Sequence, residues 1–542
     1  FIYLLREKKM NINKYIKKHL KQIDKKIAKG KIIKQKIDIQ LTNNEVKFYL
    51  YITYFSNYLK KIINNEFNFF VSIIRIDSEN IFNNLCNQIY DLKLKNFELE
   101  AFKKELRLIK RRMNIFLALI SILEEKKIEE IGVISSKFAD LLIKSSLQFC
   151  ISQYFKDNPE LFDKKMNISN SGFFLIALGK LGSYDLNFSS DVDLLFFFDH
   201  EKIKKNLNKN PGYHLNLIMK KFINILSDVN EYDFVYRIDF RLRPDPGMTP
   251  LAISISAAEN YYFGLGQNWE RAALIRSRYI CGDKKSFEDF FKVLKKFIWR
   301  PTLDFFAIDD IKSIKNQIDV TQKTNFKSLL GYNIKIGRGG IREIEFYVHI
   351  LQLIWGGKYL NLQSSNLIKS VNSLYFNDII SERIKNILIN NYFKLRNLEN
   401  RIQMLENNQN HLIPKNKEIY KKLILFFGYF NMKKFESDFI EVLRSTRTTF
   451  KELFKEDKPL NIEGDMVFTG VEPEAKTLLS IKKLNFDNVH QVWKLISGWH
   501  YGRYRIMQSE KSRQLLTILI PALLDSIGKT PHPNETLYRF DN

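Results

Sequence analysis

The amino-acid sequence predicts an α+β fold, in which a small mixed sheet with helices lies between a helical N-terminal region and a helical-bundle C-terminal region. From about residue 12 to residue 162, apolar residues recur every three or four positions and glycine is almost absent, as in amphipathic helices. Short apolar or alternating runs typical of strands follow between residues 173 and 242, and the helical spacing returns after about residue 290. We therefore divide the chain at residues 1–165, 166–290, 291–457 and 458–542.

The expected strands differ in pattern. Phe173–Leu178 and Val192–Phe198 are short apolar runs, which predicts strands buried on both faces. Phe234–Leu242 alternates strictly from Tyr236 onward, and a period of two places alternate side chains on one face of a strand. Four polar side chains should therefore share a face: Arg237, Asp239, Arg241 and Arg243.

The C-terminal part contains one clear amphipathic helix and a segment typical of linkers. The helix has an apolar stripe formed by Leu395, Leu398, Ile402 and Leu405. Pro459–Glu474, with two glycines and two prolines, is predicted to be a linker. Asn488–Ile527 should be helical, interrupted at Pro521 and ended by Gly528. The tail His532–Asn542 has no hydrophobic face of its own.

The length and net charge of the chain limit the classes of protein to which it can belong, but they do not identify a binding partner. A chain of 542 residues with 45% hydrophobic residues suits roughly two to four packed domains. Its net charge of +26 suits an anionic substrate such as a nucleotide or phosphate. The lysines, however, are spread through a background rich in Ile, Asn and Phe. Because a basic patch must be clustered to indicate nucleic-acid binding, no nucleic-acid partner is expected.

The cysteines and apolar runs indicate a cytoplasmic protein that does not enter a membrane. Cys86, Cys150 and Cys281 lie far apart and form no CxxC pair, so we expect reduced, buried thiols instead of a zinc ribbon or a disulfide framework. The longest apolar run, near Ile115–Leu123, is too short to cross a bilayer. The first residues are unlike a signal peptide, and the start at Phe1 suggests a fragment.

Three aspartates form the candidate catalytic centre. Nucleotidyl transfer uses two divalent ions about 4 Å apart, and hard ions such as Mg²⁺ or Mn²⁺ prefer carboxylate oxygens. Asp191 and Asp193 are two positions apart on an expected strand and can bridge one metal pair, with Asp239 as a third ligand. The turn at Gly182-Ser183 would let backbone amides approach phosphate oxygens. These residues together predict a metal-dependent nucleotidyltransferase.

Each part of this pattern also has a plainer interpretation. An Asp-x-Asp pair can be a solvated strand end, and a Gly-Ser pair is mostly a turn. The conjunction favours a functional site, because several charges on one strand face are costly unless they meet ligands or one another. Other chemistries lack their motifs: the sequence contains no GxxxxGK[ST] loop, no HExxH and no GxSxG elbow. His349, on an apolar helix, is interpreted as structural.

The motifs resemble those of a known family. The run ALGKLGSYDLNFSSDVDLLF at residues 177–196 resembles the bacterial glutamine synthetase adenylyltransferase and adenylyl-removing enzymes, which are nucleotidyltransferases of the polymerase-β type. The resemblance covers roughly residues 106–454. Further family signatures follow in order: Phe234–Pro244, Glu259–Tyr262, Gln267–Arg271, Asn333–Phe346 and Leu395–Arg401.

This resemblance implies a polymerase-β-like domain and a defined reaction. The family has two tandem halves: the first removes AMP from a tyrosine of glutamine synthetase by phosphorolysis, giving ADP, and the second attaches AMP from ATP. This chain has one Gly-Ser…Asp-x-Asp set, which looks like the first, and Ser509–Leu516 resembles the central linker. Glutamine synthetase, orthophosphate, a nucleotide and the PII signal protein are then the implied partners, with Mg²⁺ or Mn²⁺ as the metal.

Carried over residue by residue, the resemblance makes Asp191, Asp193 and Asp239 metal ligands and Gly182 and Ser183 the phosphate-turn residues. The arginines that share a face with Asp239 are expected to hold phosphate: Arg237, Arg241 and Arg243. The role of Gly337–Glu345 stays open between site residues and an ion-pair face, as does that of Glu270 and Arg271. Trp269 is interpreted as a core residue.

Three alternatives remain open at this stage. An enzyme of the same type could act on RNA, which would need a basic groove with aromatic stacking platforms. It could instead act on a PII signal protein. A regulator with a decayed site is the third alternative, and the intact set of three aspartates argues against it.

Overall fold

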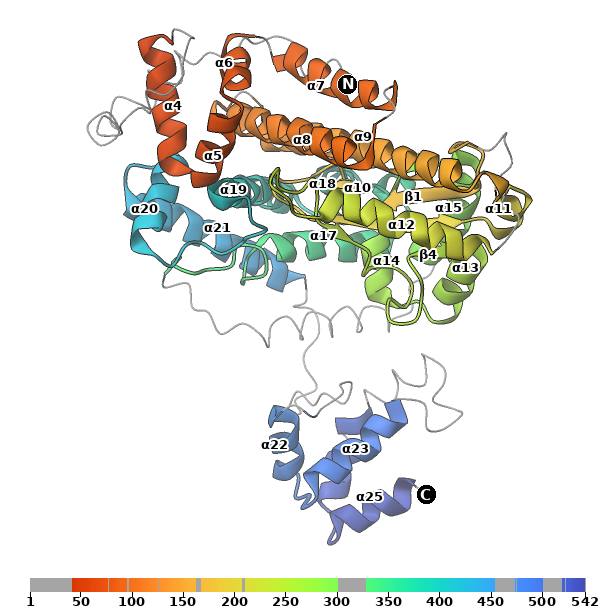
Figure 1. Ribbon diagram of the computed structural model, residues 1–542. Helices are drawn as coiled ribbons and strands as arrows, with labels where there is room; N and C mark the ends of the chain where they lie inside the picture. The colour runs from red at the N-terminus through yellow and green to blue at the C-terminus, as the bar shows by residue number, and fades with distance from the viewer. Residues whose placement is uncertain are drawn as a thin grey trace. The chain divides into compact units, whose positions relative to one another are not determined.

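The computed structural model describes residues 41–76, 78–94, 97–124, 126–161, 167–206, 210–300, 328–453, 473, 475–500, 519–521 and 523–541. Described residues up to Glu452 form one compact unit, and those from Leu453 onward form a second. The first unit contains the sheet and most of the helices (Figure 1). Apart from Pro473, the expected linker lies outside the described residues.

The N-terminal part of the first unit is helical, as predicted for its described residues. Its long helices α8 and α9 pack side by side (Figure 1). The first described helix begins at a capping box, in which Thr42 and Glu45 satisfy each other's backbone N–H groups. The elements in order are α4 (Asn43–Phe55), α5 (Asn57–Asn65), α6 (Phe67–Arg75), α7 (Ser78–Leu94), α8 (Leu99–Ile122), α9 (Ile128–Asp157) and the 3₁₀ turn η2 (Pro159–Leu161).

A five-stranded mixed sheet lies at the centre of the described catalytic region. Its strands are β1 (Phe173–Ala177), β2 (Val192–Phe198), β3 (Ile238–Asp239), β4 (Ala252–Ser254) and β5 (Arg278–Gly282). The central strand β1 pairs antiparallel with β2 and β5, whereas β3 and β4 both pair parallel with β2. The α+β prediction and the two apolar strands are thus confirmed.

Helices cover this sheet, which explains why its central strands are apolar on both faces. Every residue of β1 is buried. The ring of Phe290 packs against those of Phe174 and Phe197, so one helix lies on β1 and β2. The helices interleaved with the strands are α10 (Gly179–Gly182), α11 (His200–Asn206), α12 (Pro211–Ser227), α13 (Ile255–Gly264), α14 (Asn268–Leu274) and α15 (Lys284–Ile298).

The predicted long third strand is wrong, because only Ile238 and Asp239 pair with β2. Before them, the amides of Val235 and Tyr236 both donate to the carbonyl of Leu226, at 2.9 and 3.0 Å. After them, the chain turns, and the amide of Arg243 donates to the carbonyl of Phe240. The alternation of polar and apolar residues therefore continues past the end of the strand. Beyond Asp239 the chain is a turn, in which alternate side chains do not share a face.

The remaining helices of the first unit form a bundle. The predicted amphipathic helix is confirmed as α19, and its four apolar stripe residues are buried. In chain order the elements are α17 (Ile341–Trp355), η3 (Leu360–Leu362), α18 (Leu367–Phe376), α19 (Glu382–Glu406), α20 (Lys417–Phe426) and α21 (Met432–Glu452).

The second unit is a small helical cluster with its own apolar core. It contains α22 (Ala475–Lys483), α23 (Val489–His500), helical residues at 519–521 and 523–528, and α25 (Pro533–Asp541). Pro521 is itself helical, and residue 522 and residues 501–518 of the expected helical segment lie outside the described residues. The tail differs from expectation, because Leu537 of α25 is buried and the Trp499 indole donates to Asp541 at 2.6 Å.

Two composition-based expectations can be compared with the structure. Cys86, Cys150 and Cys281 are free and buried, as predicted. Among the helices that the structure describes, none has the length and apolar character needed to span a bilayer.

Gly339, which lies just before α17, packs against the backbone of α21, and replacing it with alanine should destabilise the bundle. Its φ of +73° disfavours a side chain, and an added Cβ would lie 1.9 Å from the Leu443 carbonyl oxygen. We expect Gly339→Ala to lower the free energy of unfolding by about 3 kcal/mol or more. Gly264→Ala, where nothing lies within 4 Å of an added Cβ, is the control in urea denaturation. Equal stability of the two variants would contradict this packing.

Candidate active site

A cavity of about 620 Å³ opens beside the end of the sheet in the first unit. Two distant parts of the chain line it. The sheet region contributes Gly179, Lys180, Asp191, Asp193, Asp239, Arg241, Trp269 and Arg276, among others. The helical bundle and its loops contribute Lys335, Arg342, Glu345, His349, Gln409 and His411. The cavity thus combines carboxylates with a larger number of cationic side chains.

Strand pairing brings the three predicted aspartates to this cavity. Asp191 directly precedes β2, and Asp193 lies two positions further along the chain, with the fully buried Val192 between them. Parallel pairing of β2 with β3 places Asp193 opposite Asp239. All three line the cavity, in agreement with the expected shared face of Asp191 and Asp193.

The three carboxylates have different electrostatic surroundings. Burial, together with the charges of Asp239 and Asp191, raises the pKa of Asp193 to about 6. Burial would also raise the pKa of Asp239, but hydrogen bonds from Arg241 outweigh it and lower the pKa. Asp191 accepts a hydrogen bond of 2.5 Å from Nε of Arg237. Asp193 is therefore the carboxylate that most resists ionisation.

The three strand arginines do not share one face. Arg241 lines the cavity, with its exposed guanidinium (84% of the side chain) paired with Asp239 at 2.5 Å. Arg237 does not line it, since its guanidinium donates to Asp191 and to the carbonyl of Ser189. Arg243 donates to three carbonyls of the following turn, those of Phe240, Pro246 and Thr249. The expectation that all three arginines point together is wrong, because the strand ends after Asp239.

Gly182 and Ser183 are not at the cavity either. A Cβ on Gly182 would lie 1.7 Å from the Arg276 carbonyl oxygen, so this glycine permits a close backbone contact. The Ser183 hydroxyl is buried, donating to the Gly179 carbonyl and accepting from Nε of Arg276. A ligand phosphate therefore has no access to the turn in this arrangement.

Gly179 and Lys180 lie at the cavity, where the sequence predicts Gly182 and Ser183. Both line the cavity. Gly179 has a φ of +55°, and a Cβ there would lie 2.4 Å from Oδ2 of Asp193. The motif contains two glycines three residues apart, and the sequence does not distinguish which one faces the carboxylates.

The Gly337–Glu345 segment serves both roles that its sequence left open. Arg342 and Glu345 line the cavity. Glu343 instead pairs with Arg447 of α21 at 2.7 Å, inside the bundle. Burial would raise the pKa of Glu345, but Arg276, paired with it at 2.7 Å, and Lys180 lower it to about 2. Glu345 thus remains ionised next to the cavity.

Other aromatic and charged residues could be assigned only from the structure. Trp269 lines the cavity and is 43% exposed, so its interpretation as a core residue is wrong. Glu270 caps α14 through the amide of Gln267, and Arg271 donates to the carbonyl of Ile298, so both have structural contacts. His349 is buried at the cavity wall, and burial together with Arg276 lowers its pKa to about 4.

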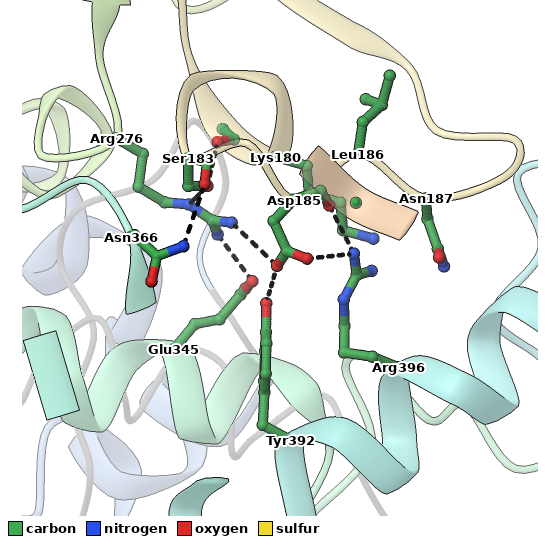
Figure 2. A network of polar contacts seen from close by, with 12 residues as sticks. Lys180, Ser183, Asp185, Leu186, Asn187, Arg276, Glu345, Asn366, Tyr392 and Arg396 are labelled. Atoms are coloured by element: carbon green, nitrogen blue, oxygen red, sulfur yellow. Dashed lines mark hydrogen bonds and ion pairs between the residues drawn. The ribbon is translucent and has the colours of Figure 1, made fainter. Parts of the chain in front are cut away.

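The loop between α10 and β2 is attached to α19 by a polar network (Figure 2). Figure 2 shows the carboxylate of Asp185 between Tyr392, Arg396 and Arg276. Three further contacts follow along the loop: Asn187 donates to Glu399 at 2.9 Å, the amide of Phe188 to Asn400 at 3.2 Å, and the amide of Ser189 to Gln403 at 2.8 Å. The polar residues of the motif therefore fix the loop that leads into Asp191.

The chemistry of the three aspartates suits a divalent cation, although Asp191 and Asp239 have arginine partners. Among the described residues, no three His, Cys, Asp or Glu side chains stand grouped so as to hold a metal ion. The three aspartates line one cavity, however, and burial together with the charges of Asp239 and Asp191 raises the pKa of Asp193. A cation relieves the repulsion between these charges. Binding would require Arg241 to leave Asp239, and its exposure permits that rotation.

Comparison with known proteins agrees with the motifs. Residues 51–292 match the family described as glutamate-ammonia ligase adenylyltransferase, and residues 312–456 match the family described as GlnD PII-uridylyltransferase. A bifunctional glutamine synthetase adenylyltransferase/adenylyl-removing enzyme of Bartonella quintana is 39% identical over 72% of this chain and 40% of its own length. The enzymes of the same name from Rhizobium meliloti and Caulobacter vibrioides are 40% and 33% identical, over 70% and 82% of this chain.

The chain is homologous to these enzymes. The family resemblance drawn from the motifs is therefore confirmed. The chain covers 39% and 45% of the Rhizobium and Caulobacter relatives, so it spans about two fifths of the length of the curated relatives it matches.

The raised pKa of Asp193 predicts a pH-dependent stability difference in protein freed of metal. A folded-state pKa of about 6 against an ordinary 3.8 means that folding resists ionisation, so stability is lost as pH rises from about 4 to about 6. Asp193→Asn should therefore be more stable than the unsubstituted protein at pH 8, by up to about 3 kcal/mol, and similar to it at pH 4. Thermal unfolding with EDTA measures this. Asp289→Asn, on the exposed side of α15, is the control, and an Asp193→Asn protein destabilised equally at both pH values would contradict the assignment.

Proposed function

We propose that this chain removes AMP from an adenylylated tyrosine of glutamine synthetase by phosphate-dependent phosphorolysis, at a polymerase-β-type nucleotidyltransferase site. The observation that carries the proposal is the pairing of Asp193 with Asp239 beside Asp191, in the lining of a cavity that also contains five cationic side chains: Lys180, Arg241, Arg276, Lys335 and Arg342. Homology to adenylyltransferase/adenylyl-removing enzymes supports the same reaction class. Only one Asp-x-Asp set of this kind occurs in the sequence, and it resembles the first half of the family.

Asp191, Asp193 and Asp239 would hold Mg²⁺ or Mn²⁺. When bound, such ions neutralise charge on the phosphoryl oxygens and lower the barrier to displacement at phosphorus. The chain itself supplies the position of the carboxylates through the β2–β3 pairing. Gly179, which has no side chain to obstruct Asp193, lets the backbone run directly beside that carboxylate.

The reaction balances without any further reactant. An oxygen of hydrogen phosphate forms a bond to the phosphorus of the tyrosine-linked AMP, and the bond between that phosphorus and the tyrosine Oη breaks. The proton carried by hydrogen phosphate ends on the tyrosine oxygen, so the products are ADP and unmodified tyrosine. A phenol with a pKa of about 10 is a moderately good leaving group, and positioning with charge stabilisation accounts for most of the catalysis.

The protein partners follow from the relatives. Glutamine synthetase is the target named in their description. A PII signal protein is proposed as a regulator, and the match of residues 312–456 to PII-uridylyltransferase also favours one alternative, in which a PII protein is the substrate.

The direct test is incubation of the chain with adenylylated glutamine synthetase, orthophosphate and Mg²⁺. ADP should be released, and omission of phosphate or addition of EDTA should stop the release. Asp191→Asn and Asp193→Asn should each lower the rate at least about 100-fold without unfolding the protein. Asp289→Asn, a charge change at an exposed ion pair, should have no effect on the rate.

Two outcomes would contradict the proposal. Free AMP produced in phosphate-free buffer would make the reaction a hydrolysis. Release of a nucleotide from a modified PII protein, with none from glutamine synthetase, would transfer the same chemistry to the alternative substrate.

A further inference from the structure

Three cationic side chains that line the cavity each have at least one N–H group that does not donate to a carboxylate: Arg276, Lys335 and Arg342. Within the part of the chain that the structure describes, neither Lys335 nor Arg342 forms an ion pair, although both line the cavity. Arg276 is more than nine-tenths buried, and its Nη2 atom has no hydrogen-bond acceptor. This atom is buried and faces Asp185, so the two cations of this set that can take a ligand oxygen are Lys335 and Arg342.

The guanidinium of Arg276 is held in a fixed orientation. Its Nε donates to the Ser183 hydroxyl at 2.7 Å, and its Nη1 donates to Glu345 at 2.7 Å (Figure 2). The carboxylate of Asp185 lies 3.9 Å from Nη2, beyond hydrogen-bond distance. Arg276 is therefore a fixed part of the cavity wall, with its three nitrogens directed toward Ser183, Glu345 and Asp185.

These cations lie close to the carboxylates. Lys335 and Arg342 line the same cavity as Asp191, Asp193 and Asp239. Lys180 differs from them, because its ammonium already pairs with the buried Glu399 at 2.7 Å. Among the described residues, the positive charge at the cavity that has no ion-pair partner is therefore that of Lys335 and Arg342, which line it together with the proposed metal ligands.

The arginines first expected to hold phosphate are occupied. Arg237 and Arg243 do not line the cavity, and the guanidinium of Arg241, which metal binding would release, pairs with Asp239 in this arrangement. In the sequence, Arg276 follows the Gln267–Arg271 motif, and Lys335 and Arg342 belong to the Asn333–Phe346 motif. The helical region therefore adds to the cavity two cations that have no ion pair within the described part of the chain, Lys335 and Arg342.

We propose that Lys335 and Arg342 form a subsite for the phosphate group next to the AMP phosphorus. It would bind orthophosphate before the reaction and the β-phosphate of ADP after it. The identity of this phosphate rests on the proposed function, whereas the existence of an oxyanion subsite depends only on the cavity. Guanidinium and ammonium groups bind phosphate through charge-assisted hydrogen bonds.

The test compares the binding of ADP and AMP, which differ by this phosphate alone. Calorimetry on the whole chain with Mg²⁺ should show that Lys335→Met weakens ADP binding about tenfold or more while AMP binding changes little. Arg342→Gln should do the same. Lys292→Met removes the same charge from an exposed position on α15 (77% exposed) and should leave both affinities unchanged. Arg276 is left intact, because its loss would also unpair the buried Glu345.

A second experiment distinguishes orthophosphate from pyrophosphate as the ligand of this subsite. With saturating AMP present, orthophosphate and pyrophosphate are titrated in turn. Tighter binding of orthophosphate, lost in Lys335→Met, supports the subsite as proposed, whereas binding of pyrophosphate alone would overturn its assignment to orthophosphate.

Two results of the first experiment would overturn the subsite itself. The first is an ADP-to-AMP affinity ratio that is the same in Lys335→Met and Lys292→Met. The second is equal weakening of AMP and ADP binding in Lys335→Met, which would place the cations on the AMP phosphate. Failure of the proposed function is distinguishable, because the chain would then release no ADP from adenylylated glutamine synthetase while the ADP preference still depended on Lys335.

Discussion

The carboxylate of Glu399 has no exposed surface, and its two oxygens join three elements of the first unit. Lys180 lies 2.7 Å from one oxygen, whereas Asn187 donates to the other at 2.9 Å and Arg396 also contacts it. Burial would raise the pKa of Glu399, but Lys180 and Arg396 outweigh it, and the pKa is well below the ordinary value. A buried charge of this kind is tolerated only when its partners are all in place. Glu399 therefore requires α10, the following loop and α19 to meet in one arrangement.

The candidate site depends on that arrangement, because it is built from both halves of the first unit. The loop that leads into Asp191 contacts α19 through Asp185, Asn187, Phe188 and Ser189. The ion pair between Arg276 and Glu345 joins the sheet region to α17 in the same way. The carboxylates thus come from the sheet, and much of the positive charge comes from the bundle. The relative position of these two sets decides whether a metal-bound nucleotide and a second phosphate fit together.

Much of this fold was predictable from local sequence patterns. Apolar runs predicted β1 and β2, the apolar stripe predicted α19, and the i, i+2 spacing placed Asp191 and Asp193 at one cavity. Local patterns failed where an element ended early. Because the alternation continues past Asp239, the pattern predicts that Arg243 lies on the strand, whereas it lies in the following turn. The local patterns also pointed to Gly182 where Gly179 lines the cavity, because only the packing of the Arg276 carbonyl against Gly182 separates the two glycines. Lys335 and Arg342 reach the cavity from more than 140 residues beyond Asp193, a contact for which the sequence has no local signal.

The most direct measurement is hydrogen–deuterium exchange of the backbone amides of residues 183–190 in Glu399→Gln and Glu382→Gln. Both substitutions remove a carboxylate from α19, but Glu382 is 66% exposed. If the buried charge holds the loop on the helix, its loss should cost about 3–5 kcal/mol of local stability. Exchange at Phe188 and Ser189 should then be at least about 100-fold faster in Glu399→Gln and unchanged in Glu382→Gln. Equal protection of the loop in both variants would contradict the account.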